Sequence, residues 1–258
     1  MKVLDCTTVS TMYESLENIL GLSKQEIQKF FSDFKSKLHP YDTPYDKTND
    51  KLLLEQIKKL IRKTDINYDR TVWFHGTRTN NDFKDGILPL GEVIENIWDN
   101  LYKLVQKEIS LEMWTEFRSN VENGLGGDGA YHYNLKINLK KAWGPYGLLI
   151  REITFIPPEK FSDVGNHNYI KIPEIIEDIC LEFDKKYQLN LKERFEDNSS
   201  KCIVHFYTFN TKEKYIGSAL HYLYLCFHDF EMDNNCSIAF DGEGVKVPSE
   251  HILSVELL

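Results

Sequence analysis

A short apolar run that ends in polar residues, within residues 71–90, restricts the fold more than any other part of the chain. Residues 72–74 are Val, Trp and Phe, which predict a strand packed on at least one face. The next four residues each carry a group that phosphate or ribose recognition can use: His75, Gly76, Thr77 and Arg78. A His-Gly pair at a strand end is by itself typical of a turn, so a site needs support from elsewhere in the chain.

The composition limits the classes of partner. With 258 residues, 41% apolar and 13% aromatic, the chain can bury a full core, as one large domain or as one domain with a helical extension. The formal net charge of -9 argues against broad binding to nucleic acid or to anionic membranes, because such binding needs an excess of Lys and Arg. A local basic groove is still compatible with this charge.

The cysteines and the N-terminus predict a soluble, cytoplasmic protein. The thiols are odd in number, widely scattered and without a CxxC pair, which is typical of free thiols in a reducing compartment: Cys6, Cys180, Cys202, Cys226 and Cys236. Cys226, His228 and Cys236 are too loosely spaced to predict a zinc site, and we interpret these cysteines as core residues. The chain has no basic start followed by an apolar core, and no apolar run long enough to span a bilayer.

Helices are expected on both sides of the central strand. Residues 1–68 show apolar stripes at helical spacing, with a capping-box pattern at Ser23 and Glu26 and a polar connection at 41–49. Residues 92–122 predict one long or broken helical segment. The glycine-rich segment 123–129 satisfies GxGxxG, but that motif needs a strand before it and a helix after it. We predict the reverse order and therefore reject a dinucleotide-binding fold.

The remaining elements alternate without a regular βαβ rhythm. Strands are predicted at 130–133, 147–155, 202–209, 237–240 and 252–258, and helices at 173–187 and 215–227. Pro157 and Pro158 close the second of these strands, and 189–200 reads as a polar surface excursion. This order predicts an α+β fold with a largely antiparallel sheet.

Four separated stretches together carry a resemblance to a known family. They are WFHGTR, then DGILPLG, then GDGAYHYN with KKAWGPYG and LLIREI, and finally VPSEHILSVELL. In this order they resemble the motifs of the ADP-ribosyltransferase fold, in the diphtheria-toxin and poly-ADP-ribose-polymerase branch. The resemblance implies a split, largely antiparallel sheet with helical insertions over residues 69–258. Residues 1–68 lie outside it as a helical N-terminal region.

The resemblance implies that NAD is the co-substrate and assigns residues to it. His75 would bind a ribose hydroxyl, the Gly76 backbone would bind the nicotinamide amide, and Tyr146 would stack on the nicotinamide ring. Tyr131 would form the second aromatic wall around that ring. Thr77 and Arg78 would lie toward the ribose or pyrophosphate, and Gly129, in the same GDGAYHYN motif as Tyr131, is also assigned to the dinucleotide. The alternative for both tyrosines is a core aromatic with a solvated hydroxyl.

The third catalytic position departs from the family pattern. Polymerases of this family carry a glutamate at the start of the strand predicted at 237–240, and Cys236 matches that position. Glu231 and Asp233 lie just upstream and are the first candidates for the acid, and Glu243 is the next. Relatives without an acid at this position transfer single ADP-ribose units or are inactive, so chain-building polymerase activity is the least favoured version.

Three functions are compatible with these residues. The first is an NAD-dependent mono-ADP-ribosyltransferase that modifies a macromolecule, as toxins and conflict-system effectors of the family do. The second is an RNA 2'-phosphotransferase, whose HGT strand and terminal segment are echoed at 248–252, although Phe74 stands where that family usually carries arginine. The third is a catalytically inactive module that binds NAD or ADP-ribose.

The lysines give the expected class of target. Only two clusters could form a basic patch for nucleic acid: Lys58, Lys59, Arg62 and Lys63, and Lys136, Lys140 and Lys141. A solvated helix face is the preferred interpretation of the first cluster. We therefore expect a protein target slightly before a nucleic acid, and no membrane partner.

Overall fold

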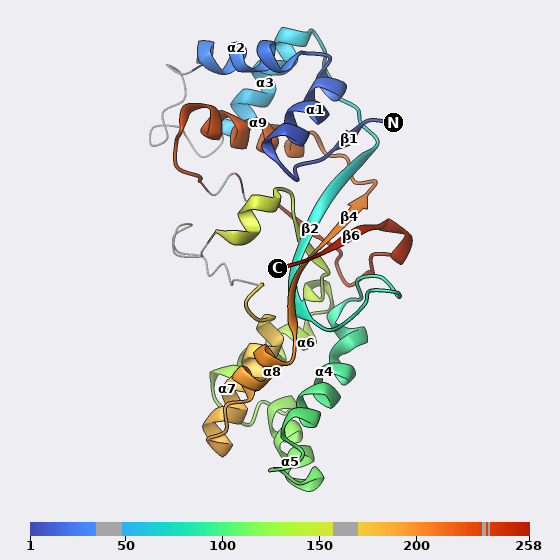
Figure 1. The fold of residues 1–258 in the computed structure, drawn as a ribbon, viewed down its shortest axis with the longest axis vertical. Coiled ribbons are helices and arrows are strands. Elements are labelled where there is room, and N and C mark those ends of the chain that lie inside the picture. The colour runs from blue at the N-terminus through green and yellow to red at the C-terminus, as the bar shows by residue number, and fades with distance from the viewer. Residues whose placement is uncertain (35–47, 157–169, 234–235, 237) are drawn as a thin grey trace. The chain divides into compact units, whose positions relative to one another are not determined.

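The computed structural model describes residues 1–34, 48–156, 170–233, 236 and 238–258 (Figure 1). Most of the predicted connection at 41–49, and the predicted stop at Pro157 and Pro158, lie outside these residues. The chain forms two compact units, each assembled from separate segments. Unit 1 contains Met1–Phe74, Gly147–Asn166 and Phe206–Phe240, and unit 2 contains His75–Tyr146, His167–His205 and Asp241–Leu258. The predicted boundary between residues 68 and 69 stays a prediction.

Unit 1 is built around one buried helix, α9 (Glu213–His228), on which α1 (Val9–Leu20), α2 (Lys24–Phe34) and α3 (Asn49–Ile61) pack (Figure 1). The residues of α9 from 215 to 225 are all buried, so its sequence is apolar on nearly every side. The predicted capping box before α2 is confirmed, because the Glu26 carboxylate accepts the Ser23 N–H at 2.7 Å. The prediction of helices in this region is also confirmed, with the addition of a short strand, β1 (Val3–Leu4).

The sheet is open, and the order of its main strands is β5-β3-β2-β4-β6. The strands are β2 (Arg70–Thr79), β3 (Tyr146–Leu148), β4 (Ser200–Thr208), β5 (Ala239–Asp241) and β6 (Ile252–Leu257). β3 pairs antiparallel with β2, with Phe74 opposite Leu148, whereas β1 pairs parallel with β2. Strands are therefore confirmed at or near 71–74, 202–209, 237–240 and 252–258, and the expected α+β class with an antiparallel sheet is confirmed.

Aromatic residues fix the strand that begins the candidate site. The Trp73 ring is fully buried in unit 1, edge-on to Tyr215 at 5.0 Å between ring centroids, and its Nε1–H donates to the Thr208 hydroxyl at 2.9 Å. A buried indole needs such an acceptor, so this hydrogen bond holds the ring in one orientation. The residue that follows Phe74 is consequently presented at a defined point of β2.

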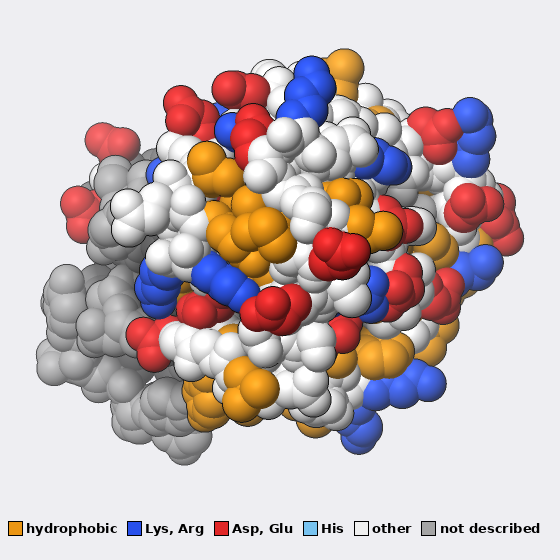
Figure 2. Space-filling model, turned by 90° about the horizontal axis from the view of Figure 1, so that it is seen from below, with side chains coloured by type: hydrophobic (Ala, Val, Ile, Leu, Met, Phe, Trp, Pro, Cys, Tyr) orange, Lys and Arg blue, Asp and Glu red, His pale blue; other side chains and the backbone are white. Residues whose placement is uncertain are grey.

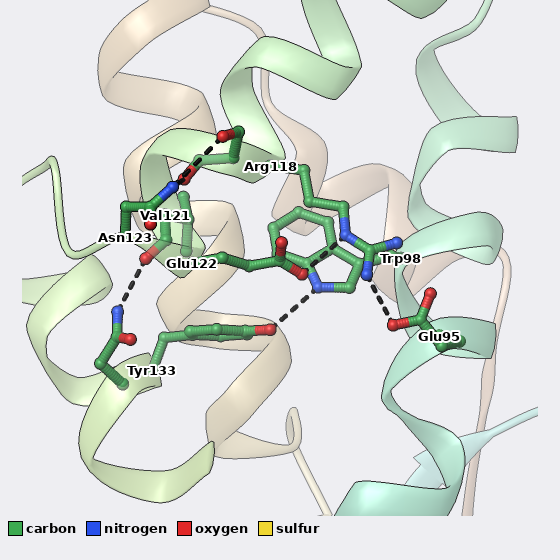
Figure 3. A network of polar contacts seen from close by, with 9 residues as sticks. Glu95, Trp98, Arg118, Val121, Glu122, Asn123 and Tyr133 are labelled. Carbon is green, nitrogen blue, oxygen red and sulfur yellow. Dashed lines mark hydrogen bonds and ion pairs between the residues drawn. The ribbon is translucent and has the colours of Figure 1, made fainter. Parts of the chain in front are cut away.

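Unit 2 is mostly helical. It contains α4 (Leu90–Val105), α5 (Leu111–Glu122), α6 (Asp128–Asn138), α7 (Glu174–Tyr187) and α8 (Leu191–Asp197) around a core of aromatic and branched side chains. The predicted helices at 92–122, in its broken form, and at 173–187 are confirmed. Figure 3 shows how polar groups join α4, α5 and α6. The Trp98 indole donates to the Tyr133 hydroxyl at 3.1 Å, and the Arg118 guanidinium bonds Glu95 at 2.6 Å.

Three local predictions were wrong. Residues 130–133 form part of α6 and not a strand, because Ala130 and Tyr133, spaced for one helix face, are buried while Tyr131 is exposed. The strand predicted at 147–155 is confined to β3, and a 3-10 helix, Arg151–Phe155, follows it. The predicted surface excursion at 189–200 contains α8, which begins where the Asn190 side chain accepts the Glu193 N–H.

Candidate functional site

Tyr146 begins β3, which lies between β2 and β5 in the sheet. β2 and β3 pair at Phe74 and Leu148, and we infer from this antiparallel register, extended two residues beyond the paired position, that Gly76 is level with Tyr146. On the other side, the Gly242 N–H donates to the Pro145 carbonyl at 2.9 Å, which in an antiparallel ladder places Asp241 opposite Tyr146. Residues opposite one another project to the same face of a sheet. Gly76, Tyr146 and Asp241 therefore form one row across three strands, which we call the Tyr146 row.

Electrostatics agree with this register. Tyr146 is 38% exposed, and partial burial is the main reason that the pKa of its hydroxyl is raised. The negative charges of Asp241 and Glu174 raise that pKa further. The Tyr146 row therefore has a partly exposed aromatic ring with two carboxylates close to it.

His75 contacts the same strand through a main-chain group. Its Nδ1 lies 2.7 Å from the Tyr146 carbonyl oxygen. A carbonyl can only accept a hydrogen bond, so Nδ1 carries the proton and Nε2 of the neutral ring is left as an acceptor. Burial lowers the pKa of the imidazole more than the bond to Tyr146 raises it. The contact between His75 and Tyr146 is from imidazole to backbone. Successive residues of a strand project to opposite faces, so His75 lies on the other face of β2 from the row that contains Gly76. The prediction that the side chains of His75 and Tyr146 line one cleft stays a prediction.

The Gly76 position is closely covered on one side. A methyl group added at its Cα would lie 3.0 Å from Cγ1 of Ile170, so a larger residue would displace that side chain. The absence of a side chain keeps the backbone of β2 accessible for a close approach. Thr77, the next residue, is half-buried.

Arg78 is engaged within unit 2. Its Nε donates to the Ser199 hydroxyl at 3.0 Å, and an Nη2–H donates to the Glu196 carbonyl near the end of α8. These bonds satisfy acceptors that the helix end leaves open. Arg78 thus ties β2 to α8, and its assignment to a pyrophosphate, for which other N–H groups remain, stays a prediction.

Gly129 serves the packing of α6. The carboxylate of Glu182 accepts the N–H groups of Gly127 and Gly129 at 2.8 and 2.9 Å, and a methyl group at Gly129 would meet the Asp178 carbonyl at 2.4 Å. An internal carboxylate therefore occupies the helix N-terminus that could bind a phosphate. Tyr131 lies on the same helix and is 62% exposed. No contact in unit 2 joins either residue to the Tyr146 row among the described residues.

The acids proposed from the sequence belong to the other unit. Glu231 and Asp233 lie in unit 1, where Asp233 Oδ2 is 2.8 Å from Nε2 of His221. Glu243, the third candidate, lies instead in unit 2, two residues after Asp241, and its N–H donates to Asp241 Oδ1 at 2.8 Å. Motif matching assigned no role to Asp241, because it placed the third catalytic position before β5, whereas Asp241 lies at the end of that strand, in the DGEG turn.

Ion pairs neutralise one lysine in each of the two basic clusters. Lys58 Nζ lies 2.8 Å from Glu213, and Lys136 Nζ lies 2.5 Å from Asp178 and 3.4 Å from Glu174. Lys140 and Lys141 are exposed. Only this pair of the second cluster therefore remains as a surface for an anionic ligand.

A pocket of about 280 Å³ lies elsewhere in unit 2, between α5 and α7, and none of its lining residues belongs to the Tyr146 row. Its lining includes Phe117, Glu182, Lys185 and Lys186. The volume is below the roughly 300–1,000 Å³ typical of small-molecule sites. Figure 2 shows a face on which hydrophobic side chains are interspersed with acidic and basic ones. This pocket therefore supports no dinucleotide site.

In comparisons with known proteins, no family model, no curated protein and no solved structure matched the chain. The resemblance thus depends on the sequence motifs alone. Among the helices of the described residues, none combines the length and hydropathy that crossing a bilayer requires.

Proposed function

We propose that unit 2 carries the reactive residues of an NAD-dependent mono-ADP-ribosyltransferase that acts on a macromolecular target. The observation that supports this most is the Tyr146 row, in which an aromatic ring, a glycine backbone and a carboxylate lie opposite one another on three strands. The family resemblance suggests the reaction. The row supplies an acid, Asp241, which the motif match lacks.

Each residue has a role that its geometry permits. The Nε2 of neutral His75 can accept a hydrogen bond from a ribose hydroxyl, because Nδ1–H is already used at Tyr146. The exposed part of the Tyr146 ring offers a surface for stacking. The Asp241 carboxylate would stabilise the positive charge that develops on the ribose when its bond to nicotinamide breaks.

The fit to NAD is better at the nicotinamide ribose than at the pyrophosphate. Gly129 donates to Glu182, and two donor groups of Arg78 are used inside unit 2. Lys140 is a candidate for binding an anion, since its backbone lies against the turn after Asp241: its carbonyl is 2.9 Å from where a methyl group on Gly244 would be. We therefore expect Lys140 and Lys141 to contact the pyrophosphate or the target.

The test is turnover of NAD labelled in the adenylate ribose, with nicotinamide release and label transfer to protein both measured. Asp241→Asn should reduce kcat by roughly 100-fold or more, with NAD affinity nearly unchanged, because the contact strengthens in the transition state. Glu243→Gln is the matched control, since it neutralises the neighbouring acid and leaves the backbone bond to Asp241 intact.

The two acids first proposed from the sequence enter the same assay as Glu231→Gln and Asp233→Asn. A loss of turnover in either of these with full activity in Asp241→Asn would contradict the assignment of Asp241. Binding of NAD with no turnover in the unchanged chain would favour the inactive binding module. Turnover that requires a 2'-phosphorylated RNA would favour the phosphotransferase.

A protein target stays the preferred class, because ion pairs engage Lys58 and Lys136, one lysine from each basic cluster. Reversing the charges of Lys140 and Lys141 should alter target modification more than NAD hydrolysis. Modification of an RNA or DNA oligomer that falls steeply with added salt would contradict the preference for protein.

A further inference from the structure

Three side chains with metal-binding atoms meet inside unit 1, apart from the residues of the proposed reaction. One ligand atom each from His221, Asp233 and Cys236 lies within 4.8 Å of the other two. Within the part of the chain that the structure describes, this is the one group of three or more such residues. The loose spacing in the sequence hid the group, since His221 is in α9 and the other two residues follow that helix.

The group is largely closed to solvent. His221 is fully buried and Cys236 is 1% exposed, while 37% of the Asp233 side chain is accessible. Nε2 of His221 contacts Asp233 at 2.8 Å, and the buried Nδ1 has no hydrogen-bond partner. An ion held by Nε2, by the Asp233 carboxylate and by the Cys236 sulfur would lie on the Nε2 side of the ring, and Nδ1 would take no part in binding it.

Thiolate, imidazole and carboxylate together form a ligand set that zinc binds, whereas calcium and magnesium prefer oxygen alone. We propose that His221, Asp233 and Cys236 form a site for a divalent metal ion of the zinc class. Binding replaces the proton of the Cys236 thiol, which leaves to solvent, and joins α9 to Asp233 and Cys236, which follow it in the chain. This site is independent of the proposed transferase reaction, whose residues belong to unit 2.

The test uses the full-length chain, freed of metal with a chelator and titrated with Co²⁺. We expect visible d–d bands and a near-ultraviolet band from a thiolate-to-cobalt transition, saturating at one ion per chain, and displacement of both by Zn²⁺. The thermal midpoint should rise with Zn²⁺, because an ion that binds only the folded state stabilises it. No thiolate band in the folded, unchanged chain would overturn the proposal.

Variants locate the ion. Cys236→Ser should abolish the thiolate band, whereas Cys180→Ser, which removes a buried thiol of unit 2, should leave it unchanged. If Cys236→Ser does not fold, Asp233→Asn is the deciding variant. Its side chain is partly exposed and keeps a hydrogen-bond acceptor for His221, so it should fold and bind Co²⁺ roughly 10- to 100-fold more weakly. Unchanged affinity in folded Asp233→Asn would also overturn the proposal.

Discussion

His75 lies where β2 changes from apolar to polar residues, and its protonation state determines what its ring can bind. The Tyr146 carbonyl fixes one nitrogen as a donor. Burial keeps the ring neutral in the range where an exposed histidine begins to take up a proton. A neutral ring with a free acceptor suits a hydroxyl ligand, whereas an imidazolium would offer only donors.

The first prediction concerns this titration. The His75 resonance, identified by its loss in His75→Gln, should titrate below the ordinary value of 6.5 in proton or nitrogen NMR. Because the folded-state pKa lies below the unfolded one, the neutral ring contributes stability that is complete above pH 6.5 and is lost as the pH falls from 6.5 through the folded value. Unfolding measurements on the variant should therefore depend less on pH in this window. A midpoint at or above 6.5 would contradict the burial of the ring.

At the scale of elements, the contact of α6 with α7 depends on a carboxylate at a helix N-terminus. Glu182 accepts two N–H groups that begin α6, and these bonds lower its pKa although burial acts in the opposite direction. The same contact explains why the glycine-rich segment cannot hold larger residues at Gly129. The helix forms here because an acid from another helix caps it.

The second prediction is that Glu182→Ala lowers the free energy of unfolding by about 2 kcal/mol, because two N–H groups lose a charged acceptor. Lys185→Ala, on the same helix and with a side chain 53% exposed, should change it by less than about 0.5 kcal/mol. The lowered pKa means that the contribution of Glu182 is present above pH 4.5 and is lost as the pH falls through the folded value. Urea unfolding of both variants tests this, and equal losses would exclude the capping role.

At the scale of the whole molecule, the units interleave along the chain. Residues 1–74 pack with residues 206–240 in unit 1, where α1, α2 and α3 all contact α9. The helix that they cover contains buried apolar residues such as Ile216, Leu220 and Leu223. The N-terminal region is therefore a part of the core of unit 1.

The third prediction follows from this packing. A fragment of residues 69–258 should lack cooperative unfolding and bind a hydrophobic dye, because the deletion uncovers the apolar sides of α9. Circular dichroism and dye fluorescence of the fragment and of the full chain give the comparison. A fragment that unfolds cooperatively, with native-like near-ultraviolet dichroism, would instead support an independent domain that starts at residue 69.

Periodicity predicted most of the elements, since long amphipathic or apolar runs such as those of α4, α7 and α9 determine their own structure. It was wrong at 130–133, where a tyrosine-rich run has strand propensity but is capped as a helix by Glu182. The prediction of a strand as far as residue 155 was wrong for a similar reason, because packing that the sequence does not show outweighed the local strand propensity. The sequence motifs predicted that His75 and Tyr146 lie close together, but they did not predict that Asp241 lies beside Tyr146.

The sequence by itself determined the α+β class, the free cysteines and the strand that leads to His75, because these follow from composition and from the local pattern of apolar residues. Only the tertiary structure decided which carboxylates lie opposite Tyr146 and which enclose Cys236. Both groupings join residues distant in the chain, through strand register in one case and helix packing in the other. Register and packing depend on the whole fold, so no local pattern encodes them.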